Sequence, residues 1–188
     1  MKEKLLIVGT GALGRVVLEY LSDKYDCSFV DDTYEEGQEI GGARVVGSTA
    51  RLEDLHKDFR RIVVALDDNV LRQMISERAK IVGYYLVSVI FDSAYVSPDA
   101  KLDDGAIVLN NALVQTGAVI GCGAVICPGA VVQPDTNIDI YSLVGTNSVV
   151  RTYSYVGKRV RIGSGCVICS RVDVPDDTLI DDGTALRL

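Results

Sequence analysis

The 188-residue chain carries 19 basic and 26 acidic side chains, a net charge of −7, and 48% of its residues are hydrophobic. The acidic balance argues against nucleic acid or an anionic membrane surface as the main partner, and no apolar run reaches the roughly 20 residues of a membrane span. The start, MKEKLLIVGTG, does not resemble a signal peptide. Five cysteines without a disulfide-framework pattern fit a reducing compartment, so we expect a cytoplasmic globular protein.

Residues 1–92 are predicted to form a small Rossmann-like α/β domain. Apolar runs predict strands, and helical spacing of apolar residues predicts the helices between them. The predicted strands are Lys4–Val8, Cys27–Val30, Arg61–Leu66 and Leu86–Ile90; helices are predicted after Gly14, over Arg51–Arg60 and over Asn69–Lys80. This alternation favours a mainly parallel sheet.

A glycine-rich loop follows the first predicted strand. It reads Gly9-Thr10-Gly11-Ala12-Leu13-Gly14, and Asp31-Asp32 follows the second strand. Such a loop brings backbone N–H groups and a helix N-terminus to a phosphate, and the acid reaches a ribose. The loop and both aspartates are therefore candidates for binding a nucleotide-sugar. The alternative is a tight turn without a ligand. With one mononucleotide-binding half, the domain is short for NAD.

Residues 93–188 follow an unbroken six-residue repeat that predicts a left-handed parallel β-helix. Three short strands form one triangular coil of about 18 residues, and each strand points one aliphatic side chain into the prism. Fifteen hexads predict five coils, roughly 24 Å of stacked strands. The aliphatic positions are Val96, Leu102, Val108, Val114, Ile120, Ile126, Val132, Ile138, Val144, Val150, Val156, Ile162, Ile168, Val174, Ile180 and Leu186.

Two other positions of each hexad suit tight corners. Mostly small side chains stand four residues after each aliphatic one, from Ala100 to Thr184. The position three after it mostly holds residues that tolerate positive φ. These are Asp99, Gly105, Asn111, Gly117, Gly123, Gly129, Asp135, Asn147, Gly165, Asp177 and Gly183, whereas Tyr141, Tyr153, Arg159 and Arg171 break the pattern.

The segments IVGTGALGRVV, FVDD, GGARVVGS, VVALDDNVLRQMI and SPDAKLDDGAIVLNNALVQTGAVIG together resemble the bacterial nucleotide-sugar acyltransferases. This family includes sialic-acid O-acetyltransferases and bacillosamine N-acetyltransferases, and the resemblance covers essentially the whole chain. It implies a homotrimer that takes acetyl from acetyl-CoA at a cleft between adjacent β-helices. It also implies a front domain that holds a nucleotide-sugar, and a role in surface polysaccharide or glycan biosynthesis.

The chain departs from this family where the resemblance implies chemistry. The family's general base is a histidine followed by an acid, and GAVVQPD places Pro134 at the histidine and Asp135 at the acid. Other family residues are replaced as well: two histidines by Leu13 and Phe91, a glycine pair by Thr152-Tyr153, and a coenzyme-binding Pro-Ala-Lys by Thr184–Leu186, with Arg187 after it.

The missing histidine affects which chemical group the protein can acetylate. A hydroxyl needs a base in the transition state, and loss of that base costs about 10²- to 10⁴-fold in rate. An amine is already partly neutral near pH 7–8 and needs only positioning and oxyanion support. We therefore favour N-acylation over O-acylation. The alternative is a catalytically silent relative that serves as a trimeric scaffold or nucleotide-sugar-binding protein.

The remaining candidates are weighed against structural roles. Asp135 is the one acid left for catalysis, yet a corner position also explains an aspartate. Arg161, Arg171 and Arg187 are candidates for the phosphates of coenzyme A. Elsewhere, His56 is predicted at the surface, Cys166 and Cys169 point differently and predict no metal site, and Lys158 and Arg159 stack on Asp176 and Asp177 as ion pairs.

Assembly is predicted from the outer faces of the repeat. Ile140, Tyr141 and Tyr153 are expected to point outward. An isolated prism exposes few such groups, so we expect a closed homotrimer to cover them.

Overall fold

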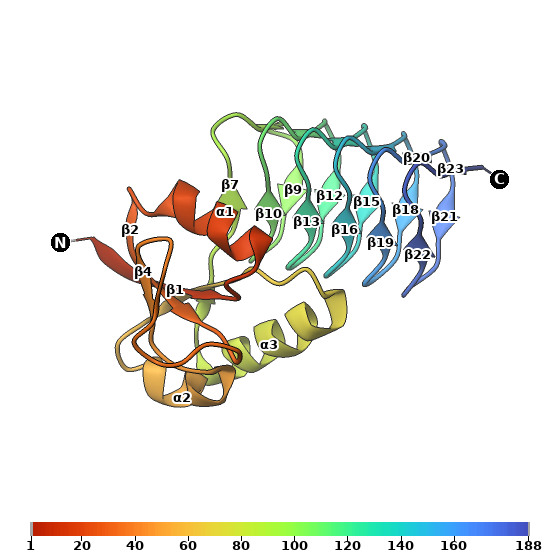
Figure 1. Cartoon of the computed structure of the whole chain (residues 1–188). Coiled ribbons are helices and arrows are strands. Elements are labelled where there is room, and N and C mark those ends of the chain that lie inside the picture. Colours follow the sequence, from red (N-terminus) through yellow and green to blue (C-terminus); the bar gives the residue numbers. More distant parts are fainter. Residues whose placement is uncertain (1, 188) are drawn as a thin grey trace. The chain divides into compact units, whose positions relative to one another are not determined.

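The computed structural model describes residues 2–187, which divide into two compact units. Unit 1 ends at Val87 and contains the helices, and unit 2 begins at Ser88 and consists of short stacked strands (Figure 1). None of the helices in the described chain has the length and apolar character that a membrane crossing needs.

Unit 1 is a six-stranded α/β unit with sheet order β3-β4-β2-β1-β5-β6, parallel throughout except for the β3–β4 pair. The predicted strands at Lys4, Cys27 and Arg61 are confirmed, as are the helices after Gly14 and over Asn69–Lys80, whereas the helix predicted over Arg51–Arg60 is shorter and covers Leu52–Leu55 alone. The elements are β1 (Glu3–Val8), α1 (Ala12–Leu21), β2 (Tyr25–Val30), β3 (Glu39–Ile40), β4 (Ala43–Val45), a 3₁₀ turn (Thr49–Arg51), α2 (Leu52–Leu55), β5 (Arg61–Val64), α3 (Asn69–Val82) and β6 (Tyr85–Leu86).

The two long helices of unit 1 follow from local sequence signals. Helix α1 buries Val17, Leu18 and Leu21 on one face, the spacing expected of an amphipathic helix. Helix α3 begins after Asp68, whose side chain accepts a hydrogen bond from the Leu71 N–H at 2.9 Å. It ends at Gly83 in the left-handed region, with φ of 105°, which is a common helix terminator.

The sequence interpretation missed one hairpin and merged two strands. The β3–β4 hairpin turns at Gly41 and Gly42, both with positive φ, a turn type that glycine favours. The predicted strand Leu86–Ile90 is wrong as a single element. Its first part is β6 in the sheet of unit 1, and its last part, β7 (Val89–Ile90), pairs with β10 (Ile107–Val108) of unit 2.

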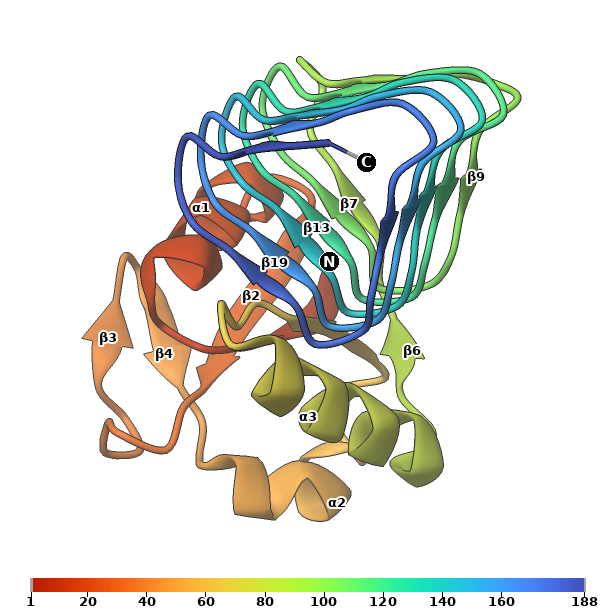
Figure 2. The ribbon, with the colours of Figure 1, turned by 90° about the vertical axis from the view of Figure 1, so that its right-hand side faces the viewer.

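Unit 2 is a left-handed parallel β-helix, and Figure 2 shows its triangular outline. Its strands form three sheets of six, six and five strands, and so five complete coils. Sheet I holds β7, β10 (Ile107–Val108), β13 (Val125–Ile126), β16 (Leu143–Val144), β19 (Arg161–Ile162) and β22 (Leu179–Ile180). Sheet II holds β8 (Tyr95–Val96), β11 (Leu113–Val114), β14 (Val131–Val132), β17 (Val149–Val150), β20 (Val167–Ile168) and β23 (Ala185–Leu186). Sheet III holds β9 (Lys101–Leu102), β12 (Val119–Ile120), β15 (Asn137–Ile138), β18 (Tyr155–Val156) and β21 (Asp173–Val174).

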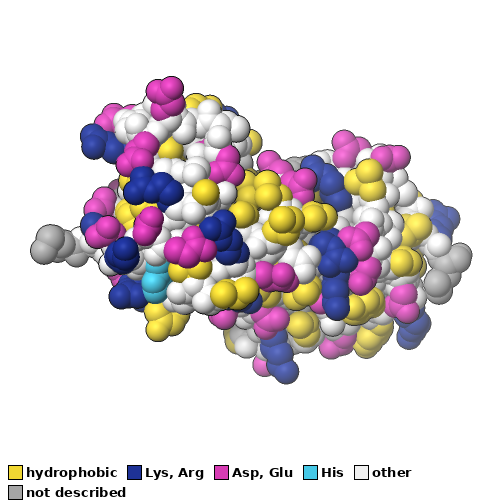
Figure 3. All heavy atoms as spheres, turned by 90° about the horizontal axis from the view of Figure 1, so that it is seen from below, with side chains coloured by type: hydrophobic (Ala, Val, Ile, Leu, Met, Phe, Trp, Pro, Cys, Tyr) yellow, Lys and Arg dark blue, Asp and Glu magenta, His cyan; other side chains and the backbone are white. Residues whose placement is uncertain are grey.

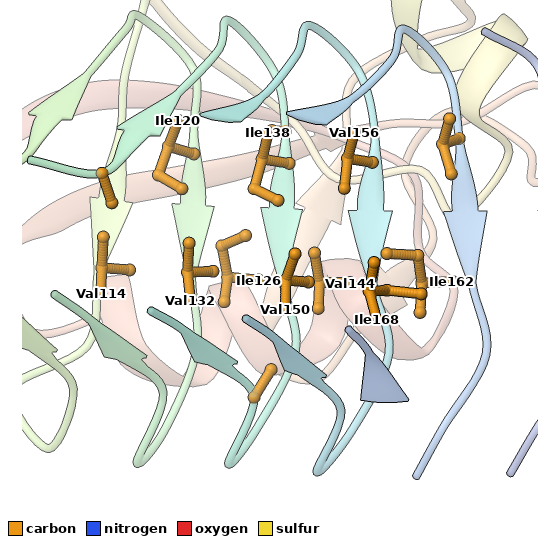
Figure 4. Packing of buried hydrophobic residues seen from close by; sticks show 14 of the residues in the cluster. Val114, Ile120, Ile126, Val132, Ile138, Val144, Val150, Val156, Ile162 and Ile168 are labelled. Carbon is orange, nitrogen blue, oxygen red and sulfur yellow. The ribbon is translucent and has the colours of Figure 1, made fainter. Parts of the chain in front are cut away.

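The interior of the prism confirms the predicted register. Every aliphatic position from Val108 to Ile180 is buried, and Val96, Leu102 and Leu186 at the ends are partly buried against the same cluster. Figure 4 shows these side chains stacked between the sheets. Most positions predicted for small side chains are buried as well. At one of them, the Ser142 hydroxyl donates a hydrogen bond to the Gly157 carbonyl of the next coil at 2.6 Å. The core therefore combines aliphatic stacking with satisfied hydroxyls.

The corners have positive φ even where the residue type does not favour it. Tyr141, Tyr153, Arg159 and Arg171 have φ of 58°, 61°, 54° and 62°. The Tyr141 N–H donates to the Cys122 carbonyl one coil earlier, at 2.9 Å, so the stack holds the corner in this conformation. Asp99 was predicted with positive φ and lacks it. No earlier coil lies at its corner, and its N–H bonds to Ser97 Oγ instead, at 3.3 Å.

The prediction that Tyr141 is exposed is wrong. It is 2% exposed, and its ring fills the space above Gly123, where an added Cβ would lie 2.5 Å from the ring. Its hydroxyl lies 3.7 Å from the Cys122 sulfur. Tyr153 is 57% exposed and Ile140 is half-buried. An aromatic corner can therefore pack on the coil before it.

Candidate functional site

A cavity of about 430 Å³ lies in unit 1 where β1 and β2 end. In a parallel sheet this edge is where ligands bind. Five of the predicted residues, Gly9, Thr10, Gly11, Asp31 and Asp32, line it. The rest of the lining is Val8, Arg15, Val30, Thr33, Tyr34, Thr49, Leu66, Leu71 and Ile75. The predicted Ala12, Leu13 and Gly14 do not line the cavity.

The three glycines of the loop serve different purposes. Gly9 has φ of +98°, and an added Cβ would lie 2.8 Å from the Ala65 carbonyl oxygen. A Cβ on Gly14 would lie 1.8 Å from the Gly9 carbonyl oxygen, so Gly14 permits α1 to pack on the loop. Gly11 has open space around it. The backbone at Gly11 is thus accessible to a ligand that approaches closely.

The start of α1 suits an anion. No side chain caps the helix at Gly11, and no acidic residue lies in its first turn, so the N–H groups there are available to a phosphate. Arg15 is exposed and lines the same cavity. The sequence interpretation missed Arg15. Its position one turn into the helix after the glycine loop was the available signal.

Asp31 joins two loops of the cavity. Its Oδ2 accepts hydrogen bonds from the N–H and the hydroxyl of Thr10, both at 2.8 Å. Its Oδ1 accepts from the N–H and the hydroxyl of Thr33, at 2.8 and 2.6 Å. Burial raises the pKa of Asp31, but the hydrogen bonds from Thr33 and Thr10 outweigh it and lower the pKa below its ordinary value.

Asp32 is exposed and accepts fewer hydrogen bonds than Asp31 does. Its two carboxylate oxygens accept one hydrogen bond each from the Thr49 N–H and hydroxyl, at 2.7 and 2.8 Å. Part of the cavity lining is apolar, with Leu66, Leu71 and Ile75. A phosphate cradle, an acidic side and an apolar wall together match the three parts of a nucleotide.

The second group of predicted residues lies along one edge of unit 2, where the strands of sheet II lead into sheet III. We name it the Pro134 edge. It contains the stacked corners Ser97–Ala100, Gln115–Ala118, Gln133–Thr136, Arg151–Ser154 and Cys169–Val172, and ends with Arg187 after β23. It unites Pro134, Asp135, Thr152, Tyr153, Arg171 and Arg187. Arg161 lies apart, in sheet I between Leu143 and Leu179.

The Pro134 edge is polar and cationic. Arg151, Arg171 and Arg187 are exposed along it, and the Arg171 guanidinium lies 5.5 Å from the centre of the Tyr153 ring. Arg151 was missed by the sequence interpretation, although its position 18 residues before Cys169 and 36 before Arg187 places it in one column. Three guanidinium groups along one edge can bind the phosphates of a coenzyme.

The position of the family histidine offers no proton acceptor. Pro134 is half-buried, and the described residues of this edge include no histidine. Asp135 is exposed with φ of 56°, and its carboxylate lies over Gly117, where an added Cβ would be 2.2 Å from Oδ1. Nearby polar contacts are the Thr152 and Ser170 hydroxyls, 3.3 Å apart. Asp135 therefore has a structural explanation as a corner residue.

The other singled-out residues have structural surroundings. His56 packs edge-on against Tyr84, with ring centres 4.8 Å apart. Figure 3 shows the histidine at a surface where acidic and basic side chains intermix. Leu13 and Phe91 are buried. Cys166 is fully buried and Cys169 half-buried. Among residues 2–187, no three histidine, cysteine or acidic side chains come together as metal ligands do.

The predicted cross-coil pairs differ in kind. Arg159 donates to both carboxylate oxygens of Asp177. Asp176, by contrast, accepts from the backbone N–H of Lys158 at 2.8 Å. The Arg159–Asp177 ion pair is therefore confirmed. Asp176 instead stabilises the corner at Lys158 through a hydrogen bond to its backbone N–H.

Comparison with known proteins finds relatives for both units. The PglD N-terminal domain family matches residues 4–79, and the GMPPB C-terminal domain family matches residues 90–187. No curated protein sequence matches the chain.

Several solved structures match over nearly the full chain. Perosamine N-acetyltransferase from Caulobacter crescentus, with CoA and GDP-perosamine, is 30% identical with a TM-score of 0.93, covering 98% of this chain and 88% of that one. Two of its structures are variants in which one histidine is replaced by asparagine or alanine, and both hold the two ligands. The PglB acetyltransferase domain from Neisseria gonorrhoeae, with acetyl coenzyme A, is 29% identical with a TM-score of 0.88, covering 99% and 97%. WeeI from Acinetobacter baumannii, at 15% identity and a TM-score of 0.70, shares the fold.

Proposed function

The chain belongs to the nucleotide-sugar acetyltransferase family, and we propose that it transfers acetyl from acetyl-CoA to the amino group of a nucleotide-linked sugar. The observation that carries the choice of acceptor is Pro134, because it stands where the resemblance expects the general base.

The nucleotide occupies the cavity of unit 1. Its phosphates lie at Gly9–Gly11 and the start of α1, with Arg15 beside them, and its base lies against the wall of Leu66, Leu71 and Ile75. Support comes from the open space at Gly11, the uncapped helix start and the exposed guanidinium. These are the features that bind a diphosphate.

The acetyl donor lies along the Pro134 edge. Arg151, Arg171 and Arg187 bind phosphates of coenzyme A through charge-assisted hydrogen bonds. Their exposure along one edge of the β-helix supports this role, as do the relatives that hold CoA or acetyl coenzyme A. Arg161 has no part in this arrangement, since it lies in sheet I.

The chemical step is aminolysis of a thioester. The neutral amine nitrogen attacks the acetyl carbonyl carbon, the carbon–sulfur bond breaks, and the thiolate leaves as coenzyme A. The proton that the nitrogen loses goes to the thiolate, directly or through water. Positioning supplies most of the acceleration, so no side chain has to remove a proton before attack. A perosamine N-acetyltransferase that lacks one histidine still holds both of its ligands.

We propose that three copies assemble through sheet II. The outward-facing residues of this sheet are apolar in every coil: Tyr95, Leu113, Val131, Val149, Val167 and Ala185. The corresponding column of sheet III is mixed, with Lys101, Val119, Asn137, Tyr155 and Asp173. A continuous apolar column on one face suits a closed ring of like subunits. Light scattering is expected to give three times the 20.3 kDa chain mass.

We place the reaction in the cytoplasm, within the synthesis of a surface polysaccharide or another glycan. Five free cysteines fit a reducing compartment.

An acetyl-transfer assay with both substrates tests the proposal. The purified protein is incubated with acetyl-CoA and with UDP- or GDP-linked amino-sugars, and released thiol and acetylated product are measured. We expect one class of amino-sugar to be acetylated. Binding of acetyl-CoA without turnover on any acceptor would instead support the silent scaffold or nucleotide-sugar-binding role.

A further inference from the structure

Attack on a thioester puts negative charge on the acetyl oxygen, and a reaction without a general base depends on groups that stabilise this charge. We infer that the side-chain amide of Gln133 donates a hydrogen bond to the acetyl oxygen. Gln133 is then a catalytic residue, directly before Pro134 in the chain. This inference rests on the proposed function, which places the acetyl donor along the Pro134 edge.

The amide of Gln133 has a fixed orientation. The residue follows β14 directly and is half-buried, and its backbone N–H donates to the Val150 carbonyl of the next coil at 2.9 Å. The side-chain oxygen Oε1 accepts a hydrogen bond from the Thr152 backbone N–H at 3.3 Å. A backbone N–H can only donate, so this contact identifies the oxygen end of the amide. The NH₂ end points away from it.

The NH₂ group of Gln133 is available to a ligand. Among residues 2–187, no group accepts a hydrogen bond from Nε2, and this nitrogen is accessible to solvent. An amide whose oxygen accepts a hydrogen bond becomes a better donor at its nitrogen, because hydrogen bonds in a chain polarise one another. The Thr152 N–H therefore both orients Gln133 and strengthens it as a donor.

The neighbouring Gln115 lacks this orientation. It occupies the equivalent position one coil earlier, since Val114 pairs with Val132, and it is also half-buried. Thr152 lies 19 positions after Gln133, and the residue at the same distance after Gln115 is Pro134. Proline has no N–H to donate, and within the described chain nothing bonds to the Gln115 amide. Of the two glutamines, only Gln133 is held for a ligand.

The charges around Gln133 suit an oxyanion. Arg151 is exposed at the equivalent position one coil later, because Val132 pairs with Val150. The acid closest in sequence, Asp135, lies over Gly117 of the preceding coil. A neutral donor with a cation on one side stabilises developing negative charge without supplying a proton.

An oriented amide donor matches the electron flow of aminolysis. When the amine nitrogen attacks the carbonyl carbon, one electron pair of the C=O bond moves onto oxygen and gives a tetrahedral oxyanion. The Gln133 NH₂ group donates to this oxygen. The C=O bond then re-forms, the carbon–sulfur bond breaks, and the thiolate takes the proton that the nitrogen loses. Gln133 gains and loses no proton, so its role needs no base at position 134.

Infrared difference spectroscopy of bound acetyl-CoA, labelled with ¹³C at the carbonyl, tests the contact without turnover. A hydrogen bond weakens the C=O bond and lowers its stretching frequency. We expect a lower frequency in the wild-type protein than in free acetyl-CoA. Gln133→Met, which keeps the length of the side chain but has no N–H, should lose most of this shift. Gln115→Met is the matched control and should keep it.

The rate of acetyl transfer to the amino-sugar tests the catalytic effect. Gln133→Met and Gln133→Glu should each lower kcat by about 10²- to 10³-fold, the usual cost of one oxyanion donor. Calorimetry should show little change in the affinity for coenzyme A, which has no acetyl oxygen. Gln133→Glu keeps an oxygen for the Thr152 N–H, so a loss in both variants does not come from an unpaired backbone group. Gln115→Met and Gln115→Glu should stay close to the wild-type rate.

The outcomes separate this inference from the proposed function. An unshifted carbonyl in the wild type, a shift that persists in Gln133→Met, or equal losses of kcat at both glutamines would overturn the inference. A shift that Gln133→Met abolishes, without acetyl transfer to any amino-sugar, would support the hydrogen bond and reject the proposed reaction. Failure of acetyl-CoA to bind would reject the donor site and the role of Gln133 together.

Discussion

The glycine loop of unit 1 and the Pro134 edge of unit 2 both contain left-handed backbone, but they specify it differently. In the loop, Gly9 has φ of +98° and its surroundings leave no room for a Cβ. At the edge, Tyr153 and Arg171 adopt φ of 61° and 62° with large side chains. In the loop the contacts dictate the residue, whereas at the edge the stacked coils dictate the backbone.

This difference explains how chemistry changes while the fold persists. Most interior corners bond to the coil before them, as the Arg171 N–H does to the Thr152 carbonyl at 3.2 Å. The side chain therefore contributes little to the corner's shape. Pro134, Thr152 and Tyr153 stand where the resemblance expects family residues, and the register of the β-helix is unchanged.

The largest expected effect is at Gly14. Because an added Cβ would lie 1.8 Å from the Gly9 carbonyl oxygen, Gly14→Ala should lower the free energy of unfolding of unit 1 by about 3 kcal/mol or more. Thermal or urea unfolding followed by circular dichroism measures it. Gly11→Ala is the matched control. With nothing within 4 Å of its added Cβ, it should change stability by less than about 0.5 kcal/mol. Equal effects at both positions would contradict the account of the loop.

The second prediction restores a base at the edge. Pro134→His should raise the acetylation rate by up to about 10²-fold, since a positioned general base is worth about that much. The comparison is the steady-state rate with the same acceptor and acetyl-CoA. Thr116→His is the control, because it puts the imidazole in the same column one coil away. A gain in the control and none at residue 134 would show that the reacting atoms lie elsewhere.

The third prediction separates two tyrosines that share one backbone conformation. Tyr141→Gly should destabilise unit 2 by about 2 kcal/mol, as the loss of a buried ring exceeds the relief of left-handed strain. Tyr153→Gly should change stability by less than about 1 kcal/mol, since Tyr153 is 57% exposed and Tyr141 2%. Urea unfolding of the two variants measures both values. A larger loss for Tyr153→Gly would mean that its contact with Arg171 stabilises the edge.

Much of the fold was predictable, because it depends on periodicities that are local in sequence. The six-residue spacing fixes the interior of unit 2, and the glycine loop marks the end of β1. The β3–β4 hairpin was missed because two short strands around Gly41-Gly42 carry little periodic signal. Tyr141 was misassigned because residue type gives no information on which corner has a glycine beneath it.

The candidate site was predictable in part. Glycines and acids at strand ends are visible in sequence, so the cavity lining was anticipated at Gly9, Gly11, Asp31 and Asp32. The different hydrogen bonding of the two aspartates was not, because it depends on Thr10, Thr33 and Thr49. Those hydrogen bonds span 2, 17 and 21 positions. No pattern in the sequence predicts these hydrogen bonds.

The smallest effect concerns acidic pH. Hydrogen bonds lower the pKa of Asp31 in the folded state, so its ionised form stabilises unit 1 at pH above the ordinary aspartate pKa of about 4. That contribution is lost as the pH falls through the lower folded value. Unfolding measured between about pH 5 and pH 3 should show a steeper loss for the wild type than for Asp31→Asn. Parallel curves would mean that Asp31 titrates alike in both states.

The choice of acceptor is the central claim, and a pair of substrates tests it most directly. The protein is given acetyl-CoA with a nucleotide-linked amino-sugar, and separately with the same nucleotide-sugar carrying a hydroxyl in place of the amine. Mass spectrometry measures the initial rate of acetyl transfer to each. We expect acetylation of the amine and none measurable of the hydroxyl, because Pro134 provides no base. Acetylation of the hydroxyl at a comparable rate would contradict the account, and would identify Asp135 as the first residue to test as the base.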